Sequence, residues 1–195
     1  MDKRMKRIII IFILLWPLSA GASIESIIKN YEFTKLIEQP QPDILNNPRL
    51  LLIPSICPVR GGYITSGFGR RRPPCRHASS LHKGVDISKA DKRDVPVVAS
   101  GGGTVVYTGR MGGYGNTIII EHWDGARTQY GHLRVILVRV GDTVSRWDKI
   151  GVMGSTGVST APHLDYKVLV RKNGRWKAVD PLDWIQEDIP FKYEI

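Results

Sequence analysis

The segment that decides the fold is NTIIIEHWDGARTQYGHL, residues 116–133. Its first part, Asn116 to His122, is rich in isoleucine, a residue that favours strands. The dipeptide Asp124-Gly125 follows, and Asp-Gly is a strong signal for a tight hairpin turn. Arg127 to Leu133 is therefore predicted to return antiparallel to the first strand.

Short strands and turns continue on both sides of this hairpin. We predict further strands at Tyr63–Ser66, Val95–Ala99, Thr104–Thr108, Val140–Val144, Lys149–Met153 and His163–Val170, the last turning at Asn173-Gly174 into Arg175–Lys177. This pattern predicts a mainly β fold, an antiparallel sandwich or a partly open barrel. Asp180 to Ile185 should form a short N-capped helix at the C-terminal end, with Pro181 at the first helical position.

The N-terminal residues are expected to lie outside this fold. A basic start, an apolar run from Ile8 to Leu18 and the small residues Ala20-Gly21-Ala22 are typical of a secretory signal, so we interpret residues 1–22 as a signal peptide. The alternative is an uncleaved anchor, although the run is short for a membrane span of about 20 residues. In both cases we expect export to the periplasm, the cell envelope or the extracellular space.

The rest of the chain divides by composition into three parts. Residues 23–38 predict an amphipathic helix, and the proline-rich residues 39–56 predict an extended linker. The folded domain should span residues 57–187, and residues 188–195 form a C-terminal tail.

The formal net charge of +10 indicates an acidic partner. Anionic wall polymers, lipid headgroups and nucleic acid all fit this charge, and export makes nucleic acid the least expected of them. The triplet Arg70-Arg71-Arg72, taken alone, is expected to be a solvated loop.

Cys57 and Cys75 are the only cysteines. Because the chain is expected to leave the reducing cytoplasm, we predict a disulfide between them. The alternative is two thiols. Metal ligation by either one is not expected, because no histidine or cysteine lies at zinc-finger spacing from them.

Three short groups contain candidate catalytic or metal-binding residues. In an extended chain the side chains alternate, so His82 and Asp86 share one face, as do His163 and Asp165. Imidazole and carboxylate are both good zinc ligands. The third group places Thr128, Tyr130 and His132 on one face of the predicted return strand. Each group taken singly is a common pattern with no function attached.

Together these groups resemble the lysostaphin/LytM-type zinc metalloendopeptidases, which have the duplicated hybrid motif fold. The resemblance covers residues 57–186 and rests on segments that occur in one order: Gly67-Phe68-Gly69-Arg70, His82-x-Gly84-x-Asp86, Pro96 to Ala99, Gly103-Thr104-Val105, Gly113 to Asn116, Tyr130-x-His132-Leu133, Gly141-Asp142-x-Val144, Ile150 to Gly157 and His163-Leu164. It implies a compact antiparallel β fold with a zinc groove. The implied substrates are short wall peptides that contain glycine or D-amino acids.

The resemblance also assigns roles to individual residues. His82 and Asp86 match zinc ligands, His163 matches the general base, and His132 matches a histidine that assists catalysis. Tyr130 and Asn116 match groove or scaffold positions of the family. We expect these two residues and Thr160 to line the substrate groove.

One position departs from the family pattern. The third zinc ligand of the family is the second histidine of a His-x-His motif, and here that position is Asp165. Aspartate can bind zinc, so His82, Asp86 and Asp165 would hold one Zn²⁺ per chain. A second carboxylate weakens the Lewis acidity of the metal and favours oxygen-preferring ions such as manganese. The alternative is a site that has lost its metal.

These observations lead to three hypotheses. The first is an exported, metal-dependent endopeptidase, a monomer that cuts the peptide cross-links of bacterial peptidoglycan. The second is an inactive module of the same fold that binds wall peptide or activates an envelope hydrolase. The third is an exported nucleic-acid-binding protein, which would need a clustered basic face with aromatic residues.

Overall fold

The computed structural model of the chain describes residues 53–76, 79–91, 93–123, 125–186 and 189. All of them belong to one compact unit that runs from Asn47 to Ile195. The predicted signal peptide, the predicted helix at 23–38 and most of the predicted linker lie outside the described residues. Within the described part, no helix has the length and apolar character needed to span a membrane.

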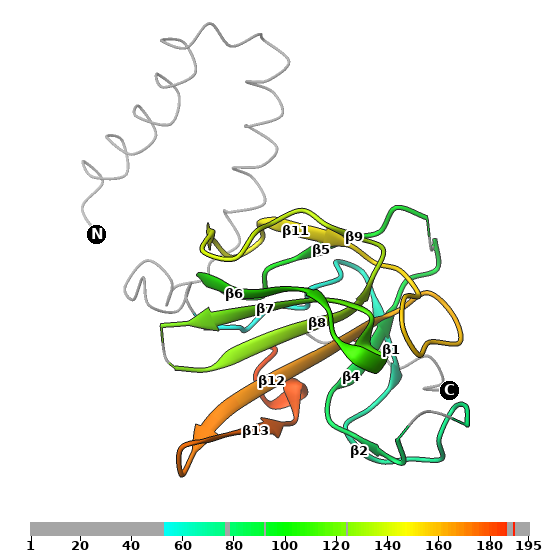
Figure 1. The fold of residues 1–195 in the computed structure, drawn as a ribbon. Coiled ribbons are helices and arrows are strands. Elements are labelled where there is room, and N and C mark those ends of the chain that lie inside the picture. The colour runs from blue at the N-terminus through cyan, green and yellow to red at the C-terminus, as the bar shows by residue number, and fades with distance from the viewer. Residues whose placement is uncertain (1–52, 77–78, 92, 124, 187–188, 190–195) are drawn as a thin grey trace, which may run out of the picture. The chain divides into compact units, whose positions relative to one another are not determined.

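Most strands belong to one antiparallel sheet. Its order is β1 (Tyr63–Ser66), β4 (Val85–Ser88), β12 (Leu164–Lys172), β8 (Arg127–Leu133), β7 (Asn116–His122), β6 (Gly103–Arg110) and β10 (Thr143–Val144), and β13 (Arg175–Val179) pairs with β12 away from this path (Figure 1). The two ends of this order, β1 and β10, do not pair with each other. The fold is therefore a mainly β antiparallel structure that stays open, as expected.

Two smaller sheets complete the unit. One has the order β5 (Pro96–Val98), β11 (Lys149–Val152) and β9 (Val135–Ile136), and the other pairs β2 (Gly69–Arg70) with β3 (Leu81–His82). The 3-10 turn η2 (Gly112–Tyr114) lies between β6 and β7, and the 3-10 turn η3 (Pro181–Asp183) follows the last strand, β13. In Figure 1 the β5–β11–β9 sheet lies over the larger sheet at β6 to β8, and the two layers enclose the core.

The predicted hairpin forms β7 and β8. Ile120 lies opposite Thr128 and Asn116 lies opposite Leu133, and the backbone N–H of Gly125 donates to the carbonyl of His122 at the turn. Alternation on β7 sends Ile118 and Ile120 into the core. The second predicted hairpin, at Asn173-Gly174, joins β12 to β13.

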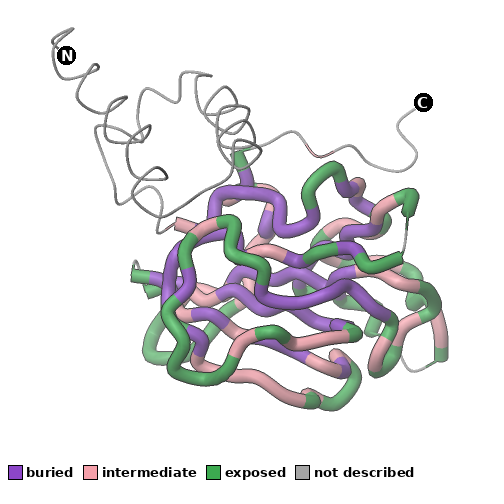
Figure 2. The backbone as a smooth tube through the Cα atoms, turned by 90° about the horizontal axis from the view of Figure 1, so that it is seen from above, coloured by how far each residue is buried: buried purple, intermediate pink, exposed green. Residues whose placement is uncertain are grey.

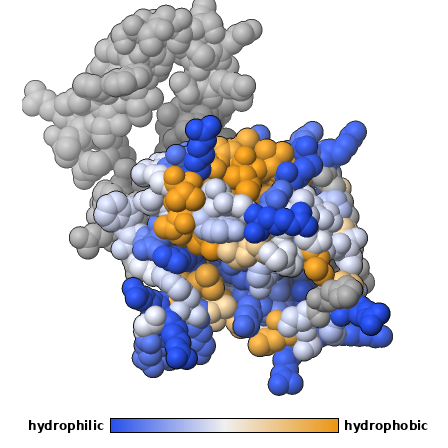
Figure 3. Space-filling view, viewed as in Figure 1, coloured by the Kyte–Doolittle hydropathy of each residue, from blue (hydrophilic) through white to orange (hydrophobic). Residues whose placement is uncertain are grey.

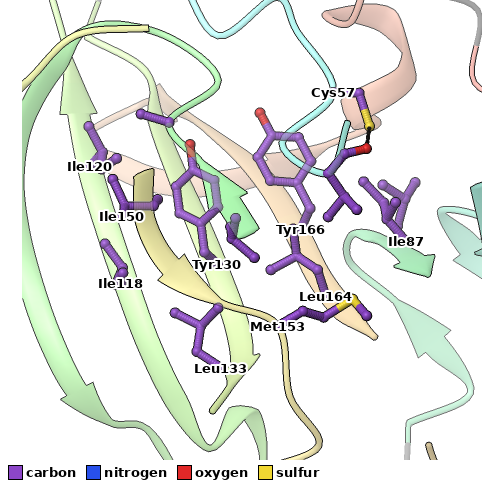
Figure 4. Packing of buried hydrophobic residues seen from close by; sticks show 14 of the residues in the cluster. Cys57, Ile87, Ile118, Ile120, Tyr130, Leu133, Ile150, Met153, Leu164 and Tyr166 are labelled. Carbon is purple, nitrogen blue, oxygen red and sulfur yellow. Dashed lines mark hydrogen bonds between the residues drawn. The ribbon is translucent and has the colours of Figure 1, made fainter. Parts of the chain in front are cut away.

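The core is built from the facing sides of the two layers. Ile118 and Ile120 of β7 and Ile150 of β11 pack with Tyr130 and Tyr166, and all five are fully buried (Figure 4). The buried backbone runs through the central strands, whereas the exposed backbone lies mostly in the connecting turns (Figure 2). At the C-terminal end, the side chain of Asp180 accepts a hydrogen bond of 3.0 Å from the backbone N–H of Leu182, which confirms the predicted N-cap of the short helix.

Some apolar surface remains exposed. Figure 3 shows it gathered on the part of this face where Figure 1 places β9 and β11. Leu137 and Val140, which follow β9 in the chain, are 50% and 61% exposed.

The predicted disulfide is not formed. Cys57 lies in the core, and its thiol donates a 3.1 Å hydrogen bond to the carbonyl of Val59 (Figure 4). Cys75 instead lines the surface groove described below. Upstream of the predicted domain start, Ser55 joins the fold, because its N–H donates to Ser100 and its carbonyl accepts from the N–H of Gln186.

Candidate metal centre

The register of the large sheet brings two carboxylates together. Asp86 on β4 lies directly opposite Asp165 on β12. Side chains of directly opposed residues in an antiparallel pair point to the same face, with Cβ atoms about 4.5–5.5 Å apart. Both aspartates are buried, at 7% and 5% exposure. Two buried carboxylates on one face need compensating positive charge.

His82 completes the group from the neighbouring small sheet. It ends β3 and is 4% exposed. Its Nδ1 lies 2.9 Å from the carbonyl of Gly67, so a proton on Nδ1 leaves the lone pair of Nε2 free. Nε2 lies 3.3 Å from Oδ1 of Asp86 and 3.5 Å from Oδ2 of Asp165. The strand β2, which begins at Gly69, fixes this geometry because it pairs with His82.

The residues fit a divalent cation. One ligand atom from each of His82, Asp86 and Asp165 lies within 4.8 Å of the other two. Nε2 of His82 and the Oδ1 atoms of both aspartates are buried and have no hydrogen-bond partner. Such unpaired polar atoms are rare in protein interiors and indicate an ion or a water that belongs there. Imidazole nitrogen and carboxylate oxygen are ligands that zinc accepts.

Two cations support the carboxylates from outside the trio. Arg71 donates from NH1 to Oδ2 of Asp86 at 2.6 Å and also to the hydroxyl of Ser66. Lys167 places its ammonium 3.6 Å from Oδ1 of Asp165. The expectation that the arginine triplet is only a solvated loop is therefore wrong for Arg71, which is half-buried and paired.

His132 and His163 lie beside the three candidate ligands. The rings of His132 and His163 have centroids 4.7 Å apart, and Nε2 of His163 lies 3.5 Å from Oδ1 of Asp86. Each ring is tied through Nδ1 to a backbone carbonyl at 2.7 Å, His132 to that of Thr156 and His163 to that of Ala161. Both Nε2 atoms are therefore the ones left available for chemistry.

His132 reaches the groove through an unusual backbone conformation. Its φ is 60°, in the left-handed region that non-glycine residues rarely adopt. Regular alternation would place His132 with Thr128 and Tyr130, as we expected. Instead those two residues point into the core, and the turned backbone sends His132 the other way.

Charges shift the pKa values of the centre when no metal is bound. Burial alone would lower the pKa of His82, but the nearby carboxylates of Asp165 and Asp86 outweigh it and raise that pKa to about 9. Burial would raise the pKa of Asp86, but His82, His163 and Arg71 together lower it to about 2. Burial, with the nearby His163, lowers the pKa of His132. Without metal, His82 is therefore protonated at neutral pH, whereas His132 is neutral.

A groove of about 660 Å³ opens onto the centre. Its lining includes His82, Asp86, Asp165, His132 and His163, together with Thr160, Tyr114, Lys167 and Arg71. Thr160, which the sequence analysis expects in the substrate groove, is among these lining residues.

Two residues expected in the groove are not among those that line it. Tyr130 is fully buried, and its hydroxyl is held by the N–H and hydroxyl of Ser100 and by Thr128. It cannot contact a substrate and is a core residue. Asn116 is half-buried, and its backbone N–H donates to the hydroxyl of Thr156, so it supports the loop that holds His132.

Comparison with known proteins gives a consistent result. The family model described as Peptidase family M23 matches residues 80–181. The chain is 38% identical over 136 residues to the peptidoglycan DD-endopeptidase ShyB of Vibrio cholerae, an alignment that covers 68% of this chain and 30% of that protein.

Solved structures show the same fold. The catalytic domain of the antimicrobial peptidase lysostaphin from Staphylococcus simulans superposes with a TM-score of 0.58 at 33% identity, covering 66% of this chain and 95% of that one. A zinc-containing peptidase from Vibrio cholerae gives a TM-score of 0.52 at 37% identity, covering 65% of this chain and 37% of that one. The match spans only 30% of the length of ShyB, and 25% to 41% of the length of other curated relatives.

Proposed function

The chain belongs to peptidase family M23, and on this basis we propose that it is an exported, metal-dependent endopeptidase that hydrolyses the peptide cross-links of bacterial peptidoglycan. The observation that carries the proposal is the convergence of three buried ligand atoms, from His82, Asp86 and Asp165, beside two histidines at the base of a groove. The relative ShyB, named a peptidoglycan DD-endopeptidase, supports the substrate class.

The proposed cofactor is one Zn²⁺ per chain, held by His82, Asp86 and Asp165. A bound zinc ion would polarise the scissile carbonyl and lower the pKa of an attacking water toward about 7. The two carboxylates also make an oxygen-preferring divalent ion such as Mn²⁺ acceptable in its place.

The two histidines supply the proton transfers. Nδ1 of His163 lies against the Ala161 carbonyl, so its Nε2 accepts the proton of the attacking water as general base. His132 is tied through Nδ1 to Thr156 in the same way. Because its pKa is lowered, it is neutral at neutral pH and has no proton on Nε2 to donate. His132 therefore stabilises the oxyanion or the leaving amine only after it has accepted a proton.

The activity is tested with purified protein and isolated cross-linked peptidoglycan. In the presence of Zn²⁺ or Mn²⁺, the protein should convert cross-linked peptide dimers to monomers, measured by chromatography of the products. His163→Ala should abolish the conversion, whereas Lys172→Ala, at the exposed end of β12, should leave it unchanged. Intact cross-links with either metal, and no difference between the wild type and His163→Ala, would overturn the proposal.

The location and partners follow from the same proposal. An exported protein of this family would act in the periplasm, the cell envelope or the extracellular space, and its basic surface would favour anionic wall polymers. We propose that it acts as a monomer on peptidoglycan peptide.

A second candidate function is a module without catalysis, which binds wall peptide or activates an envelope hydrolase. One observation favours it: Asp165 stands where the family has histidine, and Lys167 already pairs with it. Metal content separates the two candidates, because a non-catalytic module should contain less than one metal ion per chain after zinc is supplied.

A further inference from the structure

Lys167 is buried beside the candidate metal centre. The residue is 4% exposed, and its ammonium lies 3.6 Å from Oδ1 of Asp165. Lysine is almost never fully buried unless it is paired. The centroid of the Tyr114 ring lies 3.5 Å from the ammonium, a cation–π contact that holds the charge in place.

The position of Lys167 follows from its strand. It lies two residues after Asp165 on β12, so both side chains leave the same face of the sheet and enter the same groove. Lys167 lies opposite Gln129 of β8, and this side chain is uncharged. The ion pair is therefore built into the strand and does not depend on a mobile loop.

The two carboxylates of the centre each have a cation. Arg71 binds Oδ2 of Asp86, and Lys167 stands against Oδ1 of Asp165. The other oxygen of each aspartate faces Nε2 of His82. The negative charge of both aspartates is thus already balanced by residues of the chain before any ion enters.

We propose that the Lys167 ammonium is a built-in counter-ion for Asp165, which stabilises the centre without metal and makes it a weak, exchangeable metal site. This proposal deepens the proposed function, because it concerns the same centre. An aspartate in place of a neutral histidine adds a negative charge, and Lys167 cancels it. A divalent ion that binds Asp165 must compete with the ammonium for the charge of that carboxylate, in a buried site where charges interact strongly.

The test measures zinc affinity, not hydrolysis. The full chain is stripped of metal, and the zinc dissociation constant is determined at one pH and ionic strength by competition with a chromophoric chelator. The variants are Lys167→Met and Lys167→Gln, which remove the charge, and Lys167→Arg, which keeps it. Lys172→Met is the matched control, an exposed lysine on the same strand.

We expect both neutral variants to bind zinc at least about tenfold more tightly than the wild type, a change of about 1.4 kcal/mol. The zinc dissociation constants of Lys167→Arg and Lys172→Met should stay within about threefold of the wild-type value, a smaller change than the tenfold expected for the neutral variants. Without metal, Lys167→Met should melt at a lower temperature than the wild type, because Asp165 has lost its partner. With saturating zinc, its gain in melting temperature should be larger than that of the wild type.

A double-mutant cycle assigns the effect to the pair. In the Asp165→His background the carboxylate is gone, so Lys167→Met should tighten zinc binding less than it does in the wild type. An equal gain in both backgrounds would show that Lys167 acts without Asp165, and the proposal would be overturned.

Unchanged or weaker zinc binding by both neutral variants would also overturn it. If Asp165→His then binds zinc, the centre and the proposed function stand and only the role of Lys167 fails. If wall cross-links are left intact while the neutral variants gain zinc affinity, the role of Lys167 stands and the proposed activity fails.

Discussion

Asp86 and Asp165 lie directly opposite each other on β4 and β12, and one oxygen of each faces the same nitrogen, Nε2 of His82. The register of β4 and β12 sets the pairing of the two aspartates, and the pairing of β2 with β3 positions His82. A shift of one residue would turn one aspartate to the opposite face of the sheet and separate the carboxylates. The position of the two carboxylates therefore depends on the correct register of β4 and β12.

Replacing Asp165 tests its role as the third ligand. Loss of a residue that only supports a metal ligand lowers metal affinity by about 10–100-fold. Asp165→Ala removes a ligand itself, so it should lower zinc affinity by more than this. Asp165→His should restore the family ligand, and both zinc affinity and peptide cleavage should rise. Chelator competition and product chromatography measure the two effects. If Asp165→Ala binds zinc as the wild type does, Asp165 is not a ligand.

Arg71 should stabilise the metal-free fold through Asp86. Arg71→Met leaves the buried carboxylate without the partner that now lies at 2.6 Å, and the expected loss is about 1–3 kcal/mol in the free energy of unfolding. Arg70→Met removes the exposed neighbouring charge and serves as the control. Urea denaturation of both variants in the presence of a chelator measures the difference. Equal stability of the two variants would contradict a structural role for Arg71.

The stability of the metal-free protein should depend on the protonation of His82. Its pKa in the folded protein is about 9, above the ordinary value of 6.5, so protonated His82 stabilises the fold. This contribution is complete below about pH 6.5 and is lost as the pH rises through about 9. Urea titrations at pH 6, 7.5 and 9 should show the gap between wild type and His82→Gln closing. A gap that stays constant or widens with pH would be inconsistent with the raised pKa.

Gly115 should be required for the loop that holds His132. Its φ is 63°, and a Cβ there would lie 2.4 Å from backbone and side-chain atoms of Thr156. Gly115→Ala should displace Thr156, weaken the hold on His132 and lower both cleavage and melting temperature. Gly112→Ala is the matched control, because Gly112 also has a positive φ but nothing lies within 4 Å of the added carbon. Equal effects of the two variants would show that backbone strain alone matters.

The sequence was sufficient to predict the hairpins and the fold class. The isoleucine-rich strand and the Asp-Gly and Asn-Gly turns specify β7–β8 and β12–β13 through local chemistry. The strands β2, β3 and β9 were not predicted, because each has only two residues and no alternation can be read from so short a segment. β4 was also not predicted, although Val85, Asp86, Ile87 and Ser88 alternate between apolar and polar residues, which was a usable signal.

The candidate site was predicted only in part. His82, Asp86 and Asp165 share faces of extended segments, and the family resemblance linked them. The role of Arg71 depends on a contact with a different strand that no local pattern contains, whereas Lys167, two residues after Asp165 on the same strand, was a usable signal. The resemblance placed Tyr130 at a groove or scaffold position, and the structure buries it in the core. The prediction that Tyr130 and His132 share one face fails where the positive φ of His132 breaks the alternation.

The pairing of β4 with β12 brings together residues that are far apart along the chain. His82 and Asp86 are made early, whereas Asp165 comes near the C-terminal end, so the three ligands meet only after this long-range pairing has formed. An unfolded chain therefore has no preformed cradle for an ion. Metal binding therefore has to follow folding, and an exchangeable site would be occupied according to the free metal concentration around the folded protein.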